Sequence, residues 1–156
     1  MPLYNPRTTI TGVAGSNTAP SYSEGTFTPT VTFATPSGQT IVYSAQLGFY
    51  QRVGNVVFYS GQVATSTFTH SSTGNIIIGG LPFTVNAAAV DRGQVQISTS
   101  HTWPASVTQM SSVPIGGTST IELRGIGSGT AVASIGAATF TTGNNINIGF
   151  VGCYRV

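Results

Sequence analysis

Two histidines and three carboxylates are the side chains of this chain that could transfer protons near neutral pH. The histidines are His70 and His101, and the acids are Glu24, Asp91 and Glu122. A serine nucleophile needs such a base beside it, but the many serines include none in a Gly-x-Ser-x-Gly turn. Glycoside hydrolysis needs two facing carboxylates, and the three acids are scattered along the chain. The residues therefore do not favour an enzyme.

The same residues do not form a metal-binding pattern. His70 and His101 are far apart in the sequence, and Cys153 is the only cysteine. Structural zinc sites use closely spaced ligands, and calcium sites use several clustered charged oxygens. Three copies of His70 or of His101 around a symmetry axis could build a site, although a surface loop position is the simpler interpretation of His70. Cys153 has apolar neighbours, which indicates a buried or half-buried thiol. We expect no cofactor.

Charge is nearly absent from the sequence. Only 5% of the 156 residues are charged, as five arginines and three acids, whereas 40% are hydrophobic. A soluble domain normally has about a quarter charged residues, so this composition is typical of an assembly component covered by partners. The arginines form no basic stripe, which disfavours nucleic-acid binding. No apolar stretch approaches the ~20 residues of a membrane helix and no signal peptide follows Met1, so we expect no membrane partner.

One pair of opposite charges lies within a predicted strand. Glu122 and Arg124 are two positions apart in an alternating segment, which places both side chains on the same outward face. Either they bridge two subunits, or they form an exposed pair that contributes less than about 1 kcal/mol. The sequence leaves both interpretations open.

Aromatic side chains can stack on sugar rings, and four residues are candidates for such a role. They are Tyr43, Tyr50, Tyr59 and Trp103. Tyr50 and Tyr59 flank one predicted hairpin, so cross-strand packing explains them. Trp103 lies in a predicted loop, where it either contacts a ligand or closes one end of the domain, and the second role is simpler.

Alternation of apolar and polar residues with a period of two dominates the chain from residue 26 onward. It is clearest at 26–33, 56–63, 93–99, 119–126 and 144–150. No segment has apolar residues at sustained helical spacing. Eight or nine short strands, with apolar residues on one face and Thr, Ser or Gln on the other, predict an all-β protein. We expect residues 26–156 to form a jelly-roll-like antiparallel β-sandwich.

Single residues locate the turns and irregularities of this fold. Gly54 and Asn55 separate two β-prone runs and predict a two-residue hairpin. Pro29 interrupts the first alternating segment, which indicates an edge strand or a bend. Gly48 is expected at a bulge or where another group approaches the backbone closely. The run Ile76–Ile78 is typical of a strand buried on both faces.

Residues 1–25 differ from the rest of the chain and read as an extended arm. They contain three prolines, many small residues and no sustained period. Fixing such a segment costs roughly 1–2 kcal/mol per residue in backbone entropy, which its few apolar side chains cannot offset. We therefore predict that the arm docks on a neighbouring subunit or another partner. The predicted docking residues are Tyr4, Arg7, Ile10, Val13 and Tyr22.

Four phrases of the sequence carry a resemblance to a known class of proteins. They are Gly25-Thr-Phe-Thr-Pro-Thr-Val-Thr-Phe33, Gln46-Leu-Gly-Phe-Tyr-Gln-Arg-Val-Gly-Asn-Val-Val-Phe-Tyr-Ser-Gly61, Ile78-Gly-Gly-Leu-Pro-Phe-Thr84 and Gly149-Phe-Val-Gly-Cys-Tyr154. Together they resemble the β-sandwich of trimeric bacteriophage virion proteins, namely head-decoration proteins and the distal domains of tail fibres. The resemblance covers residues 25–84 and, more loosely, the last strand, whereas residues 85–140 match nothing in it. It implies a homotrimer, a structural role in the virion and no catalysis.

Two functions are compatible with this resemblance. Fibre proteins usually place the sandwich behind a long shaft, whereas a short arm with one sandwich suits a capsid decoration (cement) protein. We therefore favour a cement protein that binds the major capsid protein and stabilises the head as a trimer. The alternative is a tail-fibre or tail-tip protein that recognises host surface polysaccharide. In both cases the protein would be part of a virion assembled in the host cytoplasm.

Overall fold

The computed structural model describes residues 21–88, 93, 95–99, 107–127, 129, 131–140, 142–143 and 145–156. The strands are β1 (Tyr22–Phe27), β2 (Thr30–Thr35), β3 (Thr40–Val53), β4 (Val56–Thr69), β5 (Thr73–Gly79), β6 (Val95–Thr99), β7 (Gln109–Pro114), β8 (Ile121–Ile126), β9 (Ala133–Ser134) and β10 (Asn147–Arg155). In this part of the chain the only helical segment is the short 3-10 turn η2 (Ala137–Thr139). The predicted all-β class is confirmed.

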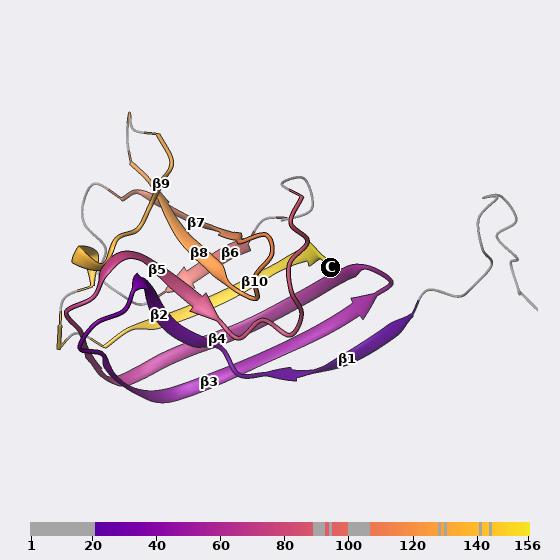
Figure 1. Ribbon diagram of the computed structural model, residues 1–156, viewed down its shortest axis with the longest axis horizontal. Coiled ribbons are helices and arrows are strands. Elements are labelled where there is room, and N and C mark those ends of the chain that lie inside the picture. Colours follow the sequence, from indigo (N-terminus) through magenta and orange to yellow (C-terminus); the bar gives the residue numbers. More distant parts are fainter. Residues whose placement is uncertain are drawn as a thin grey trace, which may run out of the picture.

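All ten strands belong to one antiparallel sheet. The strand order is β1-β3-β4-β10-β6-β7-β8-β5-β2, and β9 pairs with β8 beside this path. The sheet curls into a half-barrel around its apolar interior (Figure 1). Strands that face each other across the interior therefore belong to the same curled sheet.

The two edges of this sheet are β1 and β2. These strands are consecutive in the chain, and only Thr28 and Pro29 separate them. Side chains of β3 bind the backbone of the β2 edge. The Tyr43 hydroxyl accepts a hydrogen bond from the Val31 amide (2.8 Å) and donates one to the Val31 carbonyl (3.4 Å). The side-chain amide of Gln46 donates a hydrogen bond to the carbonyl of Pro29, which precedes β2 (2.9 Å). The break predicted at Pro29 is confirmed, and side chains rather than a backbone ladder close the half-barrel here.

Strands β3 and β4 form a long hairpin of 14 residues on each side. The two-residue turn between them is confirmed at Gly54 and Asn55, and Gly54 has a φ of 61°, which favours glycine. The pairing shifts between Val42 and Ala45, so the bulge lies there and not at Gly48.

Gly48 is instead a point of close approach, the second possibility that the sequence indicated. It pairs directly with Gly61, and a β-carbon on either residue would lie 2.5 Å from an aromatic ring. The ring over Gly48 is Phe27 and the ring over Gly61 is Phe150. These two rings contact each other at a centroid distance of 6.4 Å. The glycine pair therefore makes room for an aromatic contact inside the sheet.

The interior is apolar and contains two adjacent buried tyrosines. The rings of Tyr59 and Tyr154 are 5.4 Å apart. The Tyr154 hydroxyl donates to the Phe83 carbonyl (3.0 Å) and accepts from the Phe83 amide (3.2 Å). The Tyr59 hydroxyl has no hydrogen-bond partner among the described residues. In β5, Ile76 and Ile78 are buried but the residue between them is half-buried, so that strand is fully covered on one face only.

The first strand begins earlier than the sequence pattern indicated. β1 pairs with β3 from Tyr22, opposite Val53, to Phe27, opposite Gly48. Because the inward positions 23 and 25 are serine and glycine, the sequence shows no apolar alternation here. The strand is therefore defined by its backbone pairing with β3. The end of the predicted arm thus lies in β1, whereas Tyr4, Arg7, Ile10 and Val13 lie outside the described residues.

Candidate docking surface

The outer face of β1, β3, β4 and β10 carries side chains that point away from the core. The register places them in two neighbouring rows across these strands: Thr26, Phe49, Ser60 and Val151 in one row, and Glu24, Gln51, Phe58 and Cys153 in the other. Because side chains alternate between the two faces of a sheet, Tyr50, Tyr59 and Tyr154 point inward from the same strands. The outer rows are therefore available to a partner.

Four large apolar side chains on this face are about half exposed. The exposed fraction is 50% for Leu47 and 51% for Phe49 on β3, 52% for Phe58 on β4 and 48% for Val151 on β10. Single exposed apolar side chains are normal, but a contiguous group on neighbouring strands indicates an interaction site. We call these four residues the outer apolar patch.

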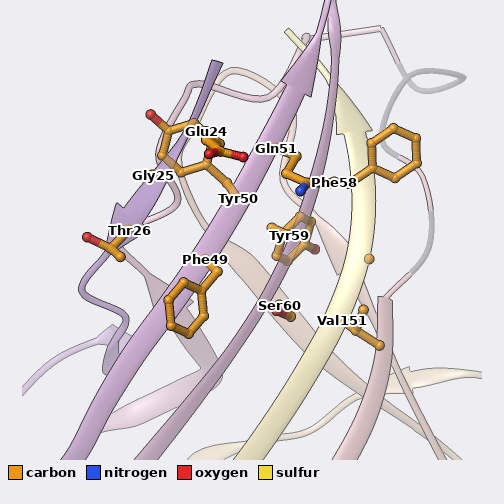
Figure 2. A pocket seen from close by; sticks show the side chains of 11 residues that line it. Glu24, Gly25, Thr26, Phe49, Tyr50, Gln51, Phe58, Tyr59, Ser60 and Val151 are labelled. Carbon is orange, nitrogen blue, oxygen red and sulfur yellow. The ribbon is translucent and has the colours of Figure 1, made fainter. Parts of the chain in front are cut away.

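An open hollow with a volume of about 550 Å³ lies in this patch. Figure 2 shows the Phe49 and Val151 side chains on either side of Ser60, with Phe58 farther along β4. Among the described residues, Glu24 is the only charged one in the lining, and its carboxylate accepts a hydrogen bond from the Tyr22 hydroxyl. The hollow thus combines apolar walls with one negative charge on its β1 side.

The sequence analysis missed this surface, because it assigned polar side chains to the outer face of each strand. That assignment is wrong for β3 and β4. Phe58 points outward between Val57 and Tyr59, which are both buried. The signal was present in the sequence as an unbroken apolar run over residues 56–59, which leaves no polar side chain for the outer face.

The tyrosines that the sequence offered as a sugar platform have structural roles instead. Tyr50 and Tyr59 are directly opposite each other on β3 and β4, so the predicted cross-strand pairing is confirmed. The Tyr50 ring packs edge-on against Phe83 at 5.2 Å. Tyr43 binds the β2 backbone, and Trp103 lies outside the described residues.

The charge pair predicted on one outward face is found on β8. Arg124 Nε lies 3.4 Å from Glu122 Oε1, and both residues are half-buried. The Ser134 hydroxyl on β9 donates to the same carboxylate oxygen. The carboxylate therefore has two partners within its own chain, and bridging to another subunit stays a prediction. This pair lies on a different part of the sheet from the outer apolar patch.

His70 is a packing residue rather than a surface loop side chain, which corrects the sequence interpretation. Its ring lies 4.4 Å from the Phe33 ring and 5.2 Å from the Phe68 ring, and its Nε2 is 2.7 Å from the Phe140 carbonyl oxygen. The Thr142 hydroxyl also donates to the His70 carbonyl (2.9 Å). Because apolar neighbours and backbone contacts hold the imidazole, His70 anchors the loop after β4. His101 lies outside the described residues.

The remaining candidate groups do not converge in the described part of the chain. Within it, no three His, Cys, Asp or Glu side chains gather where they could hold a metal ion, and no helix is long and apolar enough to cross a membrane. Cys153 is a half-buried free thiol, as expected. Comparison of the chain with protein-family models, curated proteins and solved structures gave no match.

Proposed function

We propose that this chain is a non-enzymatic structural protein of a bacteriophage particle. In this proposal it is a capsid decoration (cement) protein that binds the major capsid protein as a homotrimer and stabilises the head. The observation that carries the proposal is the outer apolar patch of Leu47, Phe49, Phe58 and Val151 on a chain with only eight charged residues. For a surface of this kind, burial against another protein is more favourable than exposure to water.

The size of the patch indicates that it acts together with other contacts. Complete burial of a large apolar side chain contributes about 1.5–3 kcal/mol, so four half-exposed side chains contribute roughly 3–6 kcal/mol together. Association itself costs roughly 4–15 kcal/mol in lost translational and rotational freedom. One patch is therefore insufficient for stable binding by a single copy. Several linked copies, or a further docking segment, would supply the difference.

A trimer supplies such linked contacts. Three copies around one axis bring three patches and three N-terminal segments together in one assembly, and closed symmetry prevents open-ended growth. In this proposal the curled sheet is a jelly-roll-like sandwich, and the protein is located in the virion. The proposal rests on the patch, on the scarcity of charge and on the resemblance of the phrases at residues 25–84.

A tail-fibre or tail-tip protein that binds host polysaccharide is the second candidate. The observation that favours it is the composition of the hollow. Two exposed aromatic rings, Phe49 and Phe58, flank a space that also contains the Glu24 carboxylate and the Gln51 amide. Aromatic faces stack on sugar rings, and carboxylate and amide groups bind sugar hydroxyls.

The number of copies per virion separates the two candidates. Quantitative mass spectrometry of purified particles, with the major capsid protein as the internal reference, gives this number directly. Hundreds of copies per particle are expected for a cement protein, whereas a few tens or fewer would indicate a tail component. Absence of the chain from purified particles would refute both.

A further inference from the structure

We propose that the hollow of the outer apolar patch holds residues 1–20 of a neighbouring copy of this chain. The inference deepens the proposed function, because it rests on self-association, but it does not require the capsid. It assigns an occupant to the hollow and a docking place to the predicted arm. Four observations support it. They are the place where residues 1–20 join the sheet, the length of this segment, the residues that it contains and the direction in which β1 runs.

The N-terminal segment joins the sheet beside the hollow. The Ser21 carbonyl accepts a hydrogen bond from the Gly54 amide (2.7 Å), so the chain enters β1 at the end where the β3–β4 hairpin turns. β1 then continues along the hollow, which Glu24 and Thr26 line. In the described part of the chain β1 pairs only with β3, so the segment is attached at a free edge of the sheet.

The segment is long enough to cross a neighbouring copy. Twenty extended residues span at most about 65–70 Å. A compact domain of this size has a radius of gyration of only about 14 Å. An arm that starts at the edge of one copy can therefore reach the outer face of the next.

The chemistry of the segment matches that of the hollow. Arg7 is the only charged residue within residues 1–20, and Glu24 is the only charged residue in the part of the lining that the structure describes. The segment also carries Tyr4, Ile10 and Val13 between prolines and small residues. Proline-containing extended segments bind grooves lined by aromatic side chains, because each proline lowers the conformational entropy that is lost on binding. Phe49 and Phe58 form such a lining.

The direction of the chain favours a neighbouring copy over the same copy. β1 begins beside the Gly54 end of the hairpin and runs from there toward the hollow, so its N-terminal end points away from the hollow. Return to its own hollow would require the chain to reverse, and Pro20 restricts the backbone at the exit. Docking on a neighbour requires no reversal, and a ring in which each arm occupies the next hollow is closed.

A photo-crosslinking experiment on the full-length chain tests this occupant. Phe58 is replaced by p-benzoylphenylalanine, and light and heavy-isotope copies are mixed, irradiated and digested for mass spectrometry. We expect crosslinks from position 58 to peptides of residues 1–20, in mixed light–heavy pairs. Val132 is the matched control position, because it is 51% exposed against 52% for Phe58 but lies beside β9, and it should give no such crosslinks.

Other products would overturn the inference. Crosslinks within one copy would place the arm in its own hollow, and crosslinks to β3, β4 or β10 of another copy would indicate packing of two sheet faces. No crosslink to another copy, in a sample shown to be oligomeric by light scattering, would also refute it while leaving self-association intact. A monomeric sample would instead refute the homotrimer of the proposed function.

A charge exchange provides an independent readout. Arg7→Glu and Glu24→Arg should each weaken self-association by about 2- to 5-fold, as expected for a partly exposed ion pair. The chain with both substitutions should recover the original affinity, measured by light scattering over a dilution series. Additive weakening in the double variant would show that the two residues do not meet.

Discussion

Tyr154 and Tyr59 allow a matched test of how hydrogen bonds stabilise the interior of the half-barrel. Both are buried, with 1% and 3% of their surface exposed, and their rings contact each other. The Tyr154 hydroxyl has two hydrogen bonds to the backbone of Phe83, whereas that of Tyr59 has no partner among the described residues. Replacement by phenylalanine removes the same single oxygen in each case. The difference between the two variants therefore reports the hydrogen bonds alone.

The expected effects have opposite signs. Tyr154→Phe leaves the Phe83 amide and carbonyl without their partner, which should lower the free energy of unfolding by about 1–3 kcal/mol. Tyr59→Phe removes a hydroxyl that was desolvated without compensation, so this variant should be unchanged or more stable by about 0.5–2 kcal/mol. The variants should therefore differ by at least about 1 kcal/mol, roughly a fivefold difference in the folding equilibrium.

Urea unfolding followed by far-ultraviolet circular dichroism measures both variants. All samples must have the same protomer concentration, because association changes apparent stability. Equal slopes with shifted midpoints would show that stability alone has changed. Loss of more than about 1 kcal/mol in Tyr59→Phe would show that its hydroxyl is hydrogen-bonded, and the reasoning would be wrong. An unchanged Tyr154→Phe would refute it equally.

Three further predictions concern pH, close packing and the sheet edge. Burial raises the pKa of Tyr154 from 10.0 to about 12 and also raises the pKa of Tyr59. Both hydroxyls therefore stay protonated in the folded state at a pH at which they ionise in the unfolded chain. The contribution of these two tyrosines to the free energy of unfolding should be constant below about pH 9 and should fall between pH 10 and 12, by up to about 1.4 kcal/mol per pH unit for each tyrosine. In an alkaline titration the stability of the Tyr154→Phe variant should therefore fall less steeply. Gly61→Ala should cost about 1–3 kcal/mol in thermal unfolding, because its β-carbon would lie 2.5 Å from an aromatic ring, whereas Gly149→Ala, with 3.5 Å to its nearest neighbour, should cost less than about 1 kcal/mol. Tyr43→Phe should lower stability by about 1–3 kcal/mol, because it leaves a β2 amide and carbonyl unpaired, and an unchanged urea midpoint would show that this contact does not close the half-barrel.

The fold class was predictable from the sequence because alternation directly reports strands with one buried face. The hairpin at Gly54 and the break at Pro29 are local consequences of residue type, and both were predicted. The curling of one sheet was not predictable. It depends on side-chain bonds between distant strands, such as Tyr43 on β3 to Val31 on β2, which leave no periodic signal.

The candidate site was largely missed for a related reason. Alternation analysis assumes that one face is apolar and the other polar, and Phe49 and Phe58 violate that assumption. His70 was also misassigned, because two of the groups that it contacts, the Phe33 ring and the Phe140 carbonyl, come from segments that are distant in sequence. Conversely, the outward placement of Glu122 and Arg124 follows from spacing alone and was correct.

The two edges of the sheet differ in how well they are covered by other parts of the chain, and this difference indicates which side of the molecule associates. An unpaired edge strand is a template for pairing with other chains, and proteins that remain monomeric protect such edges. The β2 edge is protected, because Tyr43 and Gln46 bind its backbone. In the described part of the chain no strand covers the far side of β1, although the outer apolar patch lies beside it. The chain thus protects the β2 edge with side chains of β3 and leaves apolar surface next to the β1 edge, which follows residues 1–20 in the sequence. Free energy is available for association on the β1 side, where the proposed exchange of N-terminal segments would take place.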